Sequence, residues 1–308
     1  MHTLLTLVTL WLAANLLHAA WVQSRRHCWE RRNTRDADGL LPNAAAFTVG
    51  KGPIALLLIH GFADTPRIWK RMADYLAASG AFTCRAMRLP GSAQRAPLAK
   101  NQSLTLWQQA VDKELDNLHA THSAVWAIGH SLGGALAIDA ALRRTEAIGG
   151  VAVFSPMIEV SKKRSPLLPP VVWFRLASFT LGLSPVFESC FSADGIAVDD
   201  PSFTYKRDRF IPFCVYRSLF ELIRSNRSRS ASLACPVFAV TAERDSVVDT
   251  PAALRWLAGC TGPKRVLHLT DIGHVIPLET GWQAQCDNLS VFIREQNSKR
   301  PQASSERS

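Results

Sequence analysis

The sequence predicts an α/β fold, in which a mostly parallel sheet carries helices on both faces. Short apolar segments alternate with longer amphipathic ones along most of the chain, and this alternation is typical of parallel β-α-β units. The short segments predict strands at 54–59, 81–87, 123–128, 149–154, 236–241 and 265–269. Helices are predicted at 67–78, 103–122, 135–142 and 282–295. With 308 residues and 47% apolar content, the chain can bury a full core.

One motif points to chemistry. Gly129-His130-Ser131-Leu132-Gly133 stands between the strand predicted at 123–128 and a run of good helix formers at 135–142. A strand, a Gly-x-Ser-x-Gly sequence and a helix form the context of a nucleophile elbow. The turn is so tight that small residues are needed two positions on either side of Ser131, and it lifts the hydroxyl out of the sheet. The alternative is a glycine-rich turn with an incidental serine.

A nucleophilic serine needs a base, and the base needs an acid that orients it. Two later loops offer these groups: Asp245 follows the strand predicted at 236–241, and His274 follows the strand predicted at 265–269. The carboxyl ends of parallel strands lie at one edge of a sheet, so both side chains are expected on the edge that carries Ser131. The order serine, acid, histidine is the one that an elbow of this kind requires.

Other residues compete for the acid and base roles. Glu243 and Asp249 flank Asp245, but Asp249 stands before Pro251 and is interpreted as a helix N-cap, because proline favours the first helical turn. His268 lies within a predicted strand, where it is expected to pack rather than to act as a base.

These segments make the chain resemble the α/β-hydrolase superfamily and, within it, the carboxylesterase and monoacylglycerol-lipase-like group of serine hydrolases. The resemblance is carried by Leu57-Leu58-Ile59-His60-Gly61-Phe62, the Gly129–Gly133 turn, Asp245-Ser246-Val247-Val248 and Gly273-His274-Val275-Ile276. It covers residues 45–295, the whole predicted globular part. One loop departs from the group: Leu89-Pro90-Gly91-Ser92-Ala93 stands where relatives commonly have Leu-Pro-Gly-His-Gly.

The resemblance also implies how the reacting oxygen is held. Its oxyanion hole is expected from two backbone N–H groups, those of Phe62 and Leu132. The pair His60-Gly61 is similar to the family's oxyanion motif, in which the glycine permits the backbone geometry and the histidine orders the loop. His130 is implied to support the pocket rather than to act as the base.

The implied reaction is ester hydrolysis through an acyl-enzyme on Ser131, with His274 as general base and Asp245 as its orienting acid. An ester is the expected small-molecule substrate, and no metal or other cofactor is expected. Acyl transfer to an alcohol or thiol would use the same three residues, so the sequence leaves it open. Peptidase or cofactor-free haloperoxidase chemistry and a non-catalytic, membrane-anchored binding protein are further alternatives.

Residues 157–230 break the alternation and are predicted to form an inserted cap. Within it, 169–183 and 212–224 are predicted helices. The first is too short and too polar to span a membrane, which takes about 20 apolar residues. It is interpreted either as a helix packed on the domain or as a lid whose apolar face forms an acyl-chain pocket over Ser131. The lid interpretation predicts a preference for medium or long acyl chains.

Residues 3–22 form a nearly continuous apolar run and predict one membrane span, within an anchor at 1–24. A cleaved signal peptide is the alternative. However, no Lys or Arg precedes the run, and His18 stands where cleavage after Ala20 normally requires a small residue. Arginines cluster between 25 and 35, so the positive-inside rule places the catalytic domain on the cytoplasmic side.

The predicted organisation is therefore an anchor (1–24), a basic linker (25–44), a hydrolase core in two parts (45–156 and 231–296), the cap (157–230) and a disordered polar tail (297–308). The net charge of +10 suits either an anionic membrane or an ordinary solvated basic surface. No nucleic-acid-binding motif is recognisable, so nucleic acid is not an expected partner. The odd number of cysteines, seven, favours free thiols in a reducing compartment, and the oligomeric state is left open.

Overall fold

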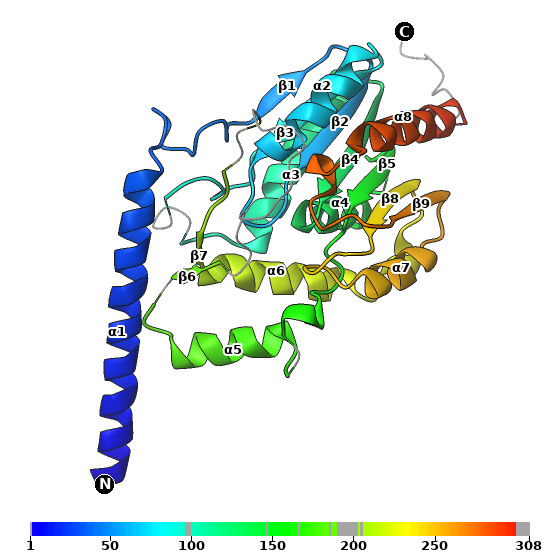
Figure 1. The fold of residues 1–308 in the computed structure, drawn as a ribbon. Coiled ribbons are helices and arrows are strands. Elements are labelled where there is room, and N and C mark those ends of the chain that lie inside the picture. Colours follow the sequence, from blue (N-terminus) through cyan, green and yellow to red (C-terminus); the bar gives the residue numbers. More distant parts are fainter. Residues whose placement is uncertain are drawn as a thin grey trace.

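The predicted alternation of strands and helices is present in the computed structural model, which describes residues 2–95, 100–145, 147–165, 167–184, 186–189, 203 and 206–299. The helices of this described part are α1 (His2–Arg32), α2 (Lys70–Ala78), α3 (Leu104–His119), α4 (Leu132–Arg143), α5 (Pro170–Thr180), α6 (Phe213–Asn226), α7 (Thr250–Ala258) and α8 (Trp282–Ser298). The strands are β1 (Phe47–Val49), β2 (Ile54–Ile59), β3 (Phe82–Met87), β4 (Ala124–His130), β5 (Gly150–Phe154), β6 (Val186–Glu188), β7 (Phe210–Pro212), β8 (Val237–Ala242) and β9 (Lys264–Leu269). Figure 1 shows their arrangement.

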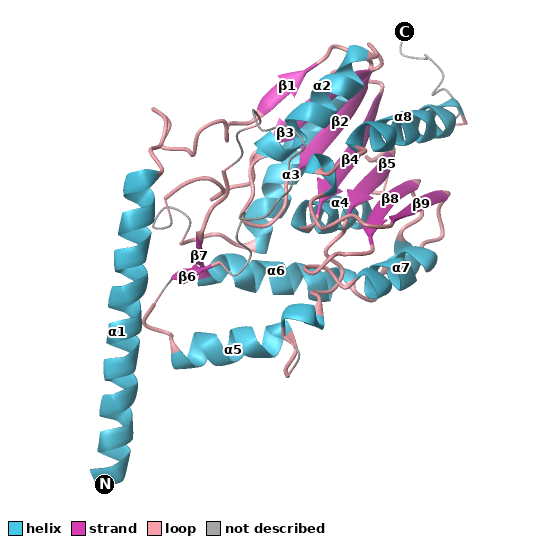
Figure 2. Ribbon diagram, viewed as in Figure 1, coloured by secondary structure: helices cyan, strands magenta, loops and turns pink. Residues whose placement is uncertain are grey.

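Within the described residues, one sheet has the strand order β1-β3-β2-β4-β5-β8-β9 (Figure 2). Its neighbours run parallel except β1, which pairs antiparallel with β3 at the edge and which the sequence does not predict. The register aligns the carboxyl ends, since Ile59 pairs with Gly129 and His130 with Phe154. The loops after β2, β4 and β8 therefore begin at one edge, where open α/β sheets form their ligand sites.

Helices cover both faces of the sheet, as predicted. α2 and α8 pack on one face, and α3, α4 and α7 pack on the other (Figure 1). β2 shows why both faces must be covered. Leu57 and Ile59 enter the core beneath α4, whereas Leu56 and Leu58 enter the core beneath α2 and α8. Because successive side chains of a strand point to opposite faces, an unbroken apolar strand is buried only between two layers of helices.

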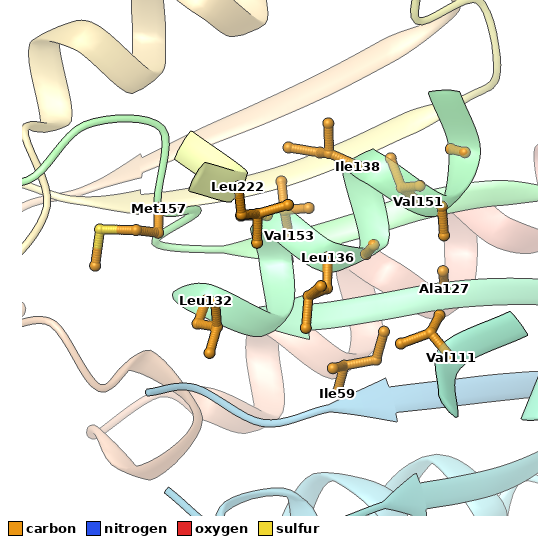
Figure 3. Close-up of a cluster of buried hydrophobic side chains, with 14 of the residues drawn as sticks. Ile59, Val111, Ala127, Leu132, Leu136, Ile138, Val151, Val153, Met157 and Leu222 are labelled. Carbon is orange, nitrogen blue, oxygen red and sulfur yellow. The ribbon is translucent and has the colours of Figure 1, made fainter. Parts of the chain in front are cut away.

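The helix that follows the Gly-x-Ser-x-Gly turn is buried along nearly its whole length. All side chains of α4 from Leu132 to Leu142 are buried. Figure 3 shows Leu136 and Ile138 of this helix among Ile59 of β2, Val153 of β5 and Leu222 of α6. The sheet lies on one side of α4 and α6 on the other, so the start of α4 has a fixed position.

The segment between β5 and β8 forms α5, α6 and the antiparallel pair β6–β7. The helices predicted at 169–183 and 212–224 are present as α5 and α6, whereas the sequence does not predict the strand pair. α6 packs on α4 through Leu219 and Leu222. α5 packs on α6 and lies on the side of α6 that faces away from the sheet (Figure 1).

The first and last helices extend further along the chain than the sequence predicts. α1 continues past the apolar run at 3–22 through the first part of the predicted linker, to Arg32. Its length and composition are sufficient to cross a membrane, and most of its apolar side chains are exposed. At the other end, α8 reaches Ser298 within the predicted tail, and residues 300–308 lie outside the described residues.

Candidate active site

Ser131 lies in the turn between β4 and α4 with an unusual backbone conformation. Its φ of 54° and ψ of −116° place a residue with a Cβ in a region that glycine usually occupies. Such a conformation costs on the order of 1–3 kcal/mol and persists only where the surroundings enforce it. Here the Ser131 N–H donates to the Phe154 carbonyl of β5 at 2.9 Å, which ties the turn to the neighbouring strand.

The two glycines of the motif are required by close backbone contacts. A Cβ on Gly133 would lie 2.0 Å from the Ile59 carbonyl oxygen of β2, and one on Gly129 would lie 2.1 Å from the backbone of Gly133. Both distances are far below van der Waals contact. The strand-to-helix turn therefore closes only with glycine at both positions, as the Gly-x-Ser-x-Gly pattern predicts.

The structure brings Ser131, His274 and Asp245 together. The Ser131 hydroxyl lies 3.0 Å from His274 Nε2, and His274 Nδ1 donates to Asp245 Oδ2 at 2.7 Å. Both distances are within hydrogen-bonding range. The three residues come from loops after β4, β9 and β8, which end at the same edge of the sheet. The serine and the carboxylate are buried, and 10% of the His274 side chain is exposed.

Asp245 is held as a carboxylate by its surroundings. Burial alone would raise the pKa of this group, but the neighbouring His274 and two backbone donors outweigh it, so the pKa lies below its usual value. The donors are the N–H groups of Val247 and Val248, both bound to Oδ1 at 2.7 and 2.8 Å. Oδ2 is thus left to His274, and the carboxylate fixes the imidazole with its proton on Nδ1.

The competing acids and histidine lie elsewhere. Asp249 accepts the Ala252 N–H at 2.8 Å as the N-cap of α7, as the sequence predicts, and Glu243 is exposed. His268 lies within β9, where its Nδ1 is 3.0 Å from the Thr241 hydroxyl. Among the described residues, no group of three or more histidine, cysteine or acidic side chains is arranged to hold a metal ion.

His130 is hydrogen-bonded to the backbone of His274, the candidate base. Its Nε2–H donates to the His274 carbonyl at 2.9 Å, and the two rings lie 4.8 Å apart between centroids. Nδ1 is therefore the unprotonated nitrogen, and it lies 4.0 Å from Asp64 Oδ2. Burial, together with the nearby His274, lowers the pKa of His130 to about 3. The ring is consequently neutral near pH 7 and fixes the backbone of His274.

His60 joins two loops at the same edge. Its Nδ1–H donates to the Gly61 carbonyl at 3.0 Å, and its Nε2 accepts the Leu89 N–H at 3.1 Å. Burial lowers the pKa of His60, so this neutral tautomer is stable. The loop that contains Phe62 is thereby attached to the loop after β3.

Two residues of the 157–230 segment that the sequence did not single out also hold the loop of Phe62. Arg207 Nη2 donates to the Phe62 carbonyl at 2.9 Å, and the Asp208 N–H donates to the Ala63 carbonyl at 3.1 Å. Asp208 Oδ2 accepts the Ala93 N–H at 2.6 Å, and burial raises the pKa of this carboxyl to about 7. Arg207 and Phe62 are 145 residues apart in the chain, and no motif links them.

A cavity of about 470 Å³ opens beside Ser131 and His274. Its walls are largely apolar and come from both the core and the segment between β5 and β8. α5 contributes Trp173, Phe174 and Ala177, and α6 contributes Tyr216, Leu219 and Phe220. Phe62 lines it too and contacts Tyr216, with ring centroids 4.9 Å apart. A cavity of this size and lining fits a small molecule with an apolar chain.

The buried, neutral His130 makes stability depend on pH. The unfolded chain takes up a proton near pH 6.5, whereas folded His130 resists protonation down to a pKa of about 3. Between these values the unfolded state binds more protons, so the free energy of unfolding falls as the pH is lowered, by about 1.4 kcal/mol per unit from this residue. His130→Gln is expected to make the free energy of unfolding, measured with urea between pH 6 and pH 4, depend less steeply on pH. His268→Gln, on β9, is the control. An equal slope in wild type and His130→Gln would contradict this assignment.

Comparison with known proteins shows the family to which the chain belongs. A profile of the "Alpha/beta hydrolase family" matches residues 56–285. The "Thermostable monoacylglycerol lipase" of Bacillus sp. (strain H-257) is 22% identical over 242 residues, which cover 78% of this chain and 90% of the lipase. A dihydrolipoyllysine-residue acetyltransferase component of the acetoin cleaving system of Cupriavidus necator is 32% identical over 124 residues, which are 40% of this chain and only 31% of that protein.

Solved structures share the fold. In a study of LipS and LipT, two metagenome-derived lipolytic enzymes, one structure superposes with a TM-score of 0.71 at 19% identity and covers 83% of this chain and 99% of its own. At 19% identity, the superposition is evidence for a shared fold alone. The family profile covers both halves of the sheet and the loops of Ser131, Asp245 and His274, and on this ground the chain belongs to the alpha/beta hydrolase family.

Proposed function

We propose that this chain is a membrane-anchored serine hydrolase that cleaves carboxylic esters with apolar acyl groups. The observation that carries the proposal is the unbroken pair of hydrogen bonds from Asp245 through His274 to the Ser131 hydroxyl. A buried carboxylate, a histidine oriented by it and a serine in an elbow are the groups that turn a weak nucleophile into a strong one. The lipase-like relatives support the substrate class.

The reaction follows from these positions. His274 Nε2 takes the hydroxyl proton as Ser131 Oγ attacks the ester carbonyl carbon, and Asp245 stabilises the resulting imidazolium. The N–H groups of Phe62 and Leu132 hold the oxyanion; Leu132 is the first residue of α4, where N–H groups have no partner within the helix. The imidazolium then returns its proton to the leaving alkoxide. Water, deprotonated by His274, attacks the acyl-enzyme, and the acid and free Ser131 are released.

The membrane anchor is α1. Its run at 3–22 has the length of one span, and the arginines between 25 and 35 favour the cytoplasmic side for the hydrolase domain under the positive-inside rule. Export after signal-peptide cleavage is the alternative, in which the mature chain would lack the apolar run.

Ser131→Ala is expected to lower ester hydrolysis by about 10⁶-fold, because the nucleophile is removed and His274 has no hydroxyl to deprotonate. A fluorophosphonate probe is expected to label wild type at Ser131 and to leave the variant unlabelled, as read by peptide mass spectrometry. Ser123→Ala, just before the start of β4, is the control and keeps full labelling. Wild-type turnover of a p-nitrophenyl ester by Ser131→Ala would rule out this mechanism.

A separate experiment tests which of Asp245, Asp249 and Glu243 is the acid that orients His274. Asp245→Asn is expected to lower kcat by about 10⁴-fold, because an amide neither fixes the required tautomer nor stabilises the imidazolium. Asp249→Ala is expected to leave kcat near wild type and to cost about 1 kcal/mol of stability through loss of the α7 N-cap. Glu243→Gln changes neither quantity. Steady-state kinetics and thermal unfolding of the three variants are compared, and a larger loss of kcat at Asp249 or Glu243 would reassign the acid.

The apolar cavity predicts the acyl preference. Each additional methylene buried in it is worth about 0.8 kcal/mol, so kcat/KM is expected to rise about fourfold per carbon from acetyl toward octanoyl p-nitrophenyl esters. Ala177→Phe fills part of the α5 wall and is expected to shift the optimum to shorter chains. Identification of the products as free acid or as a new ester separates hydrolysis from acyl transfer. A strict preference for acetyl esters would contradict the assignment of the cavity.

A further inference from the structure

α5 is an apolar helix that packs on α6 on one side and is exposed on the other. None of its side chains is buried, and Trp173, Leu176 and Phe179 are 45%, 43% and 80% exposed. The chain just before and after the helix adds Leu167 (84%) and Leu183 (45%). So many exposed large apolar side chains in one short segment, with Arg175 the exposed charged residue of the helix, are unusual on a soluble protein and indicate a surface that contacts something apolar. We name residues 167–183, as far as they are described, the α5 surface.

α5 is tied to the middle of the apolar run of α1. Asn15 is 1% exposed, and its Nδ2 donates to the Thr180 carbonyl at the end of α5 at 2.6 Å. Its Oδ1 accepts the Leu183 N–H at 3.4 Å. An amide on an apolar helix is costly unless its polar atoms are bonded. Nδ2 also donates to the Trp11 carbonyl within α1 at 2.9 Å, and the chain at the end of α5 supplies the other two bonds. Asn15 therefore sets the level along α1 at which α5 lies.

A second contact fixes the region just beyond the apolar run. Arg25 forms a two-pronged ion pair with Glu188 of β6, at 2.6 and 2.8 Å, and Arg209 binds the same carboxylate at 2.7 Å. The hydrogen bond from Arg25 is the main cause of a lowered pKa at Glu188. Val22 packs between these contacts against Val186 and Phe210. α1 and the cap are thus joined at two levels, and these contacts fix the position of the end of α5 along α1.

The level of Asn15 corresponds to a depth in a membrane. Asn15 precedes Val22, the end of the apolar run, by seven residues, which is about 10 Å along a helix axis. Helices that lie in a membrane surface bury their apolar side about 5–10 Å below the headgroups. Figure 1 shows α5 lying crosswise to α1 rather than along it. When α1 spans a bilayer, α5 therefore lies in the plane of the leaflet, with its exposed apolar side chains at the depth of the acyl chains.

We propose that the α5 surface is embedded in the same leaflet from which α1 emerges, and that the cavity takes its ester directly from that leaflet. The occupant of the surface is the acyl-chain layer, because the end of α5 is hydrogen-bonded to Asn15 within the apolar run of α1, whose other side chains are mostly exposed. Trp173 both lines the cavity and is 45% exposed, so the wall between Ser131 and the lipid is a single helix. The choice of an ester as the molecule that enters rests on the function proposed above; the embedding of α5 does not.

Contact between the α5 surface and lipid acyl chains can be measured by photolabelling, which does not depend on catalysis. The full-length protein is placed in phosphatidylcholine vesicles that contain a phosphatidylcholine with a diazirine in its acyl chain, and labelled peptides are mapped by mass spectrometry after illumination. Labelling is expected in residues 3–22 and on the α5 surface. β9 and α8 lie away from α5 (Figure 1), and their exposed apolar residues Val266 and Val291 serve as internal controls that stay unlabelled. Labelling of α1 without the α5 surface would overturn the proposal, whatever the enzyme hydrolyses.

Variants distinguish the role of Asn15, which positions the end of α5 along α1, from the role of the exposed apolar side chains of α5. Asn15→Leu keeps α1 apolar but removes the bonds to α5, so labelling of the α5 surface is expected to fall while that of α1 is unchanged. The double variant Leu176→Ser/Phe179→Ser is expected to lower hydrolysis of a vesicle-embedded monoacylglycerol by about tenfold or more, with hydrolysis of water-soluble p-nitrophenyl butyrate unchanged. Val291→Ser is the matched control. An equal loss on both substrates would refute lipid delivery, whereas no activity of wild type on either ester would refute the proposed function and leave the labelling result standing.

Discussion

The conformation of Ser131 is the constraint on which the site depends. A residue with a positive φ at the junction of β4 and α4 turns the chain sharply enough to present the hydroxyl at the edge of the sheet. That turn brings the backbone at Gly133 against the Ile59 carbonyl, so a side chain is excluded there. The fully buried α4 and the bond from the Ser131 N–H to Phe154 hold the strained conformation in place. The hydroxyl is consequently presented to His274 by the backbone, rather than by a choice of rotamer alone.

The segment between β5 and β8 does more than cover the cavity. At its start, the Ser161 N–H donates to the Val247 carbonyl and Lys163 Nζ donates to the Asp245 carbonyl, at 2.8 and 2.9 Å, so the segment is bonded to the loop of Asp245. At its end, Arg207 and Asp208 are bonded to the loop of Phe62. Opposite sides of the active site are thus held by one inserted segment. Displacement of this segment would disturb the loops of both Asp245 and Phe62, which couples the segment to the proposed chemistry.

The departure of the loop after β3 from the usual Leu-Pro-Gly-His-Gly pattern has a structural counterpart. Ala93, in this loop, has a φ of 60°, and its N–H is bound by Asp208. Its carbonyl accepts a hydrogen bond from Arg35, which follows α1. The loop is therefore held by the cap on one side and by the chain that leads from α1 on the other. The basic segment after the apolar run is in part a structural element that reaches the edge of the active site.

Sequence by itself determined the α/β class, the positions of the core strands along the chain and the four loops that follow them at the sheet edge, because burial on two faces and the elbow turn impose local residue patterns. The order of the strands in the sheet came from the structure. The sequence also separated Asp249, an N-cap, from Asp245. It did not reveal β1 or the β6–β7 pair, and it did not reveal the roles of Arg207 and Asp208. The partners of these segments lie far along the chain, and their own sequences show no periodic pattern of apolar residues. The bonds of Asn15 to the end of α5 were equally hidden, since an asparagine in an apolar run looks like an interruption. Contacts of that kind are decided only in three dimensions, because a hydrogen bond depends on where two distant segments meet and leaves no pattern in either of them.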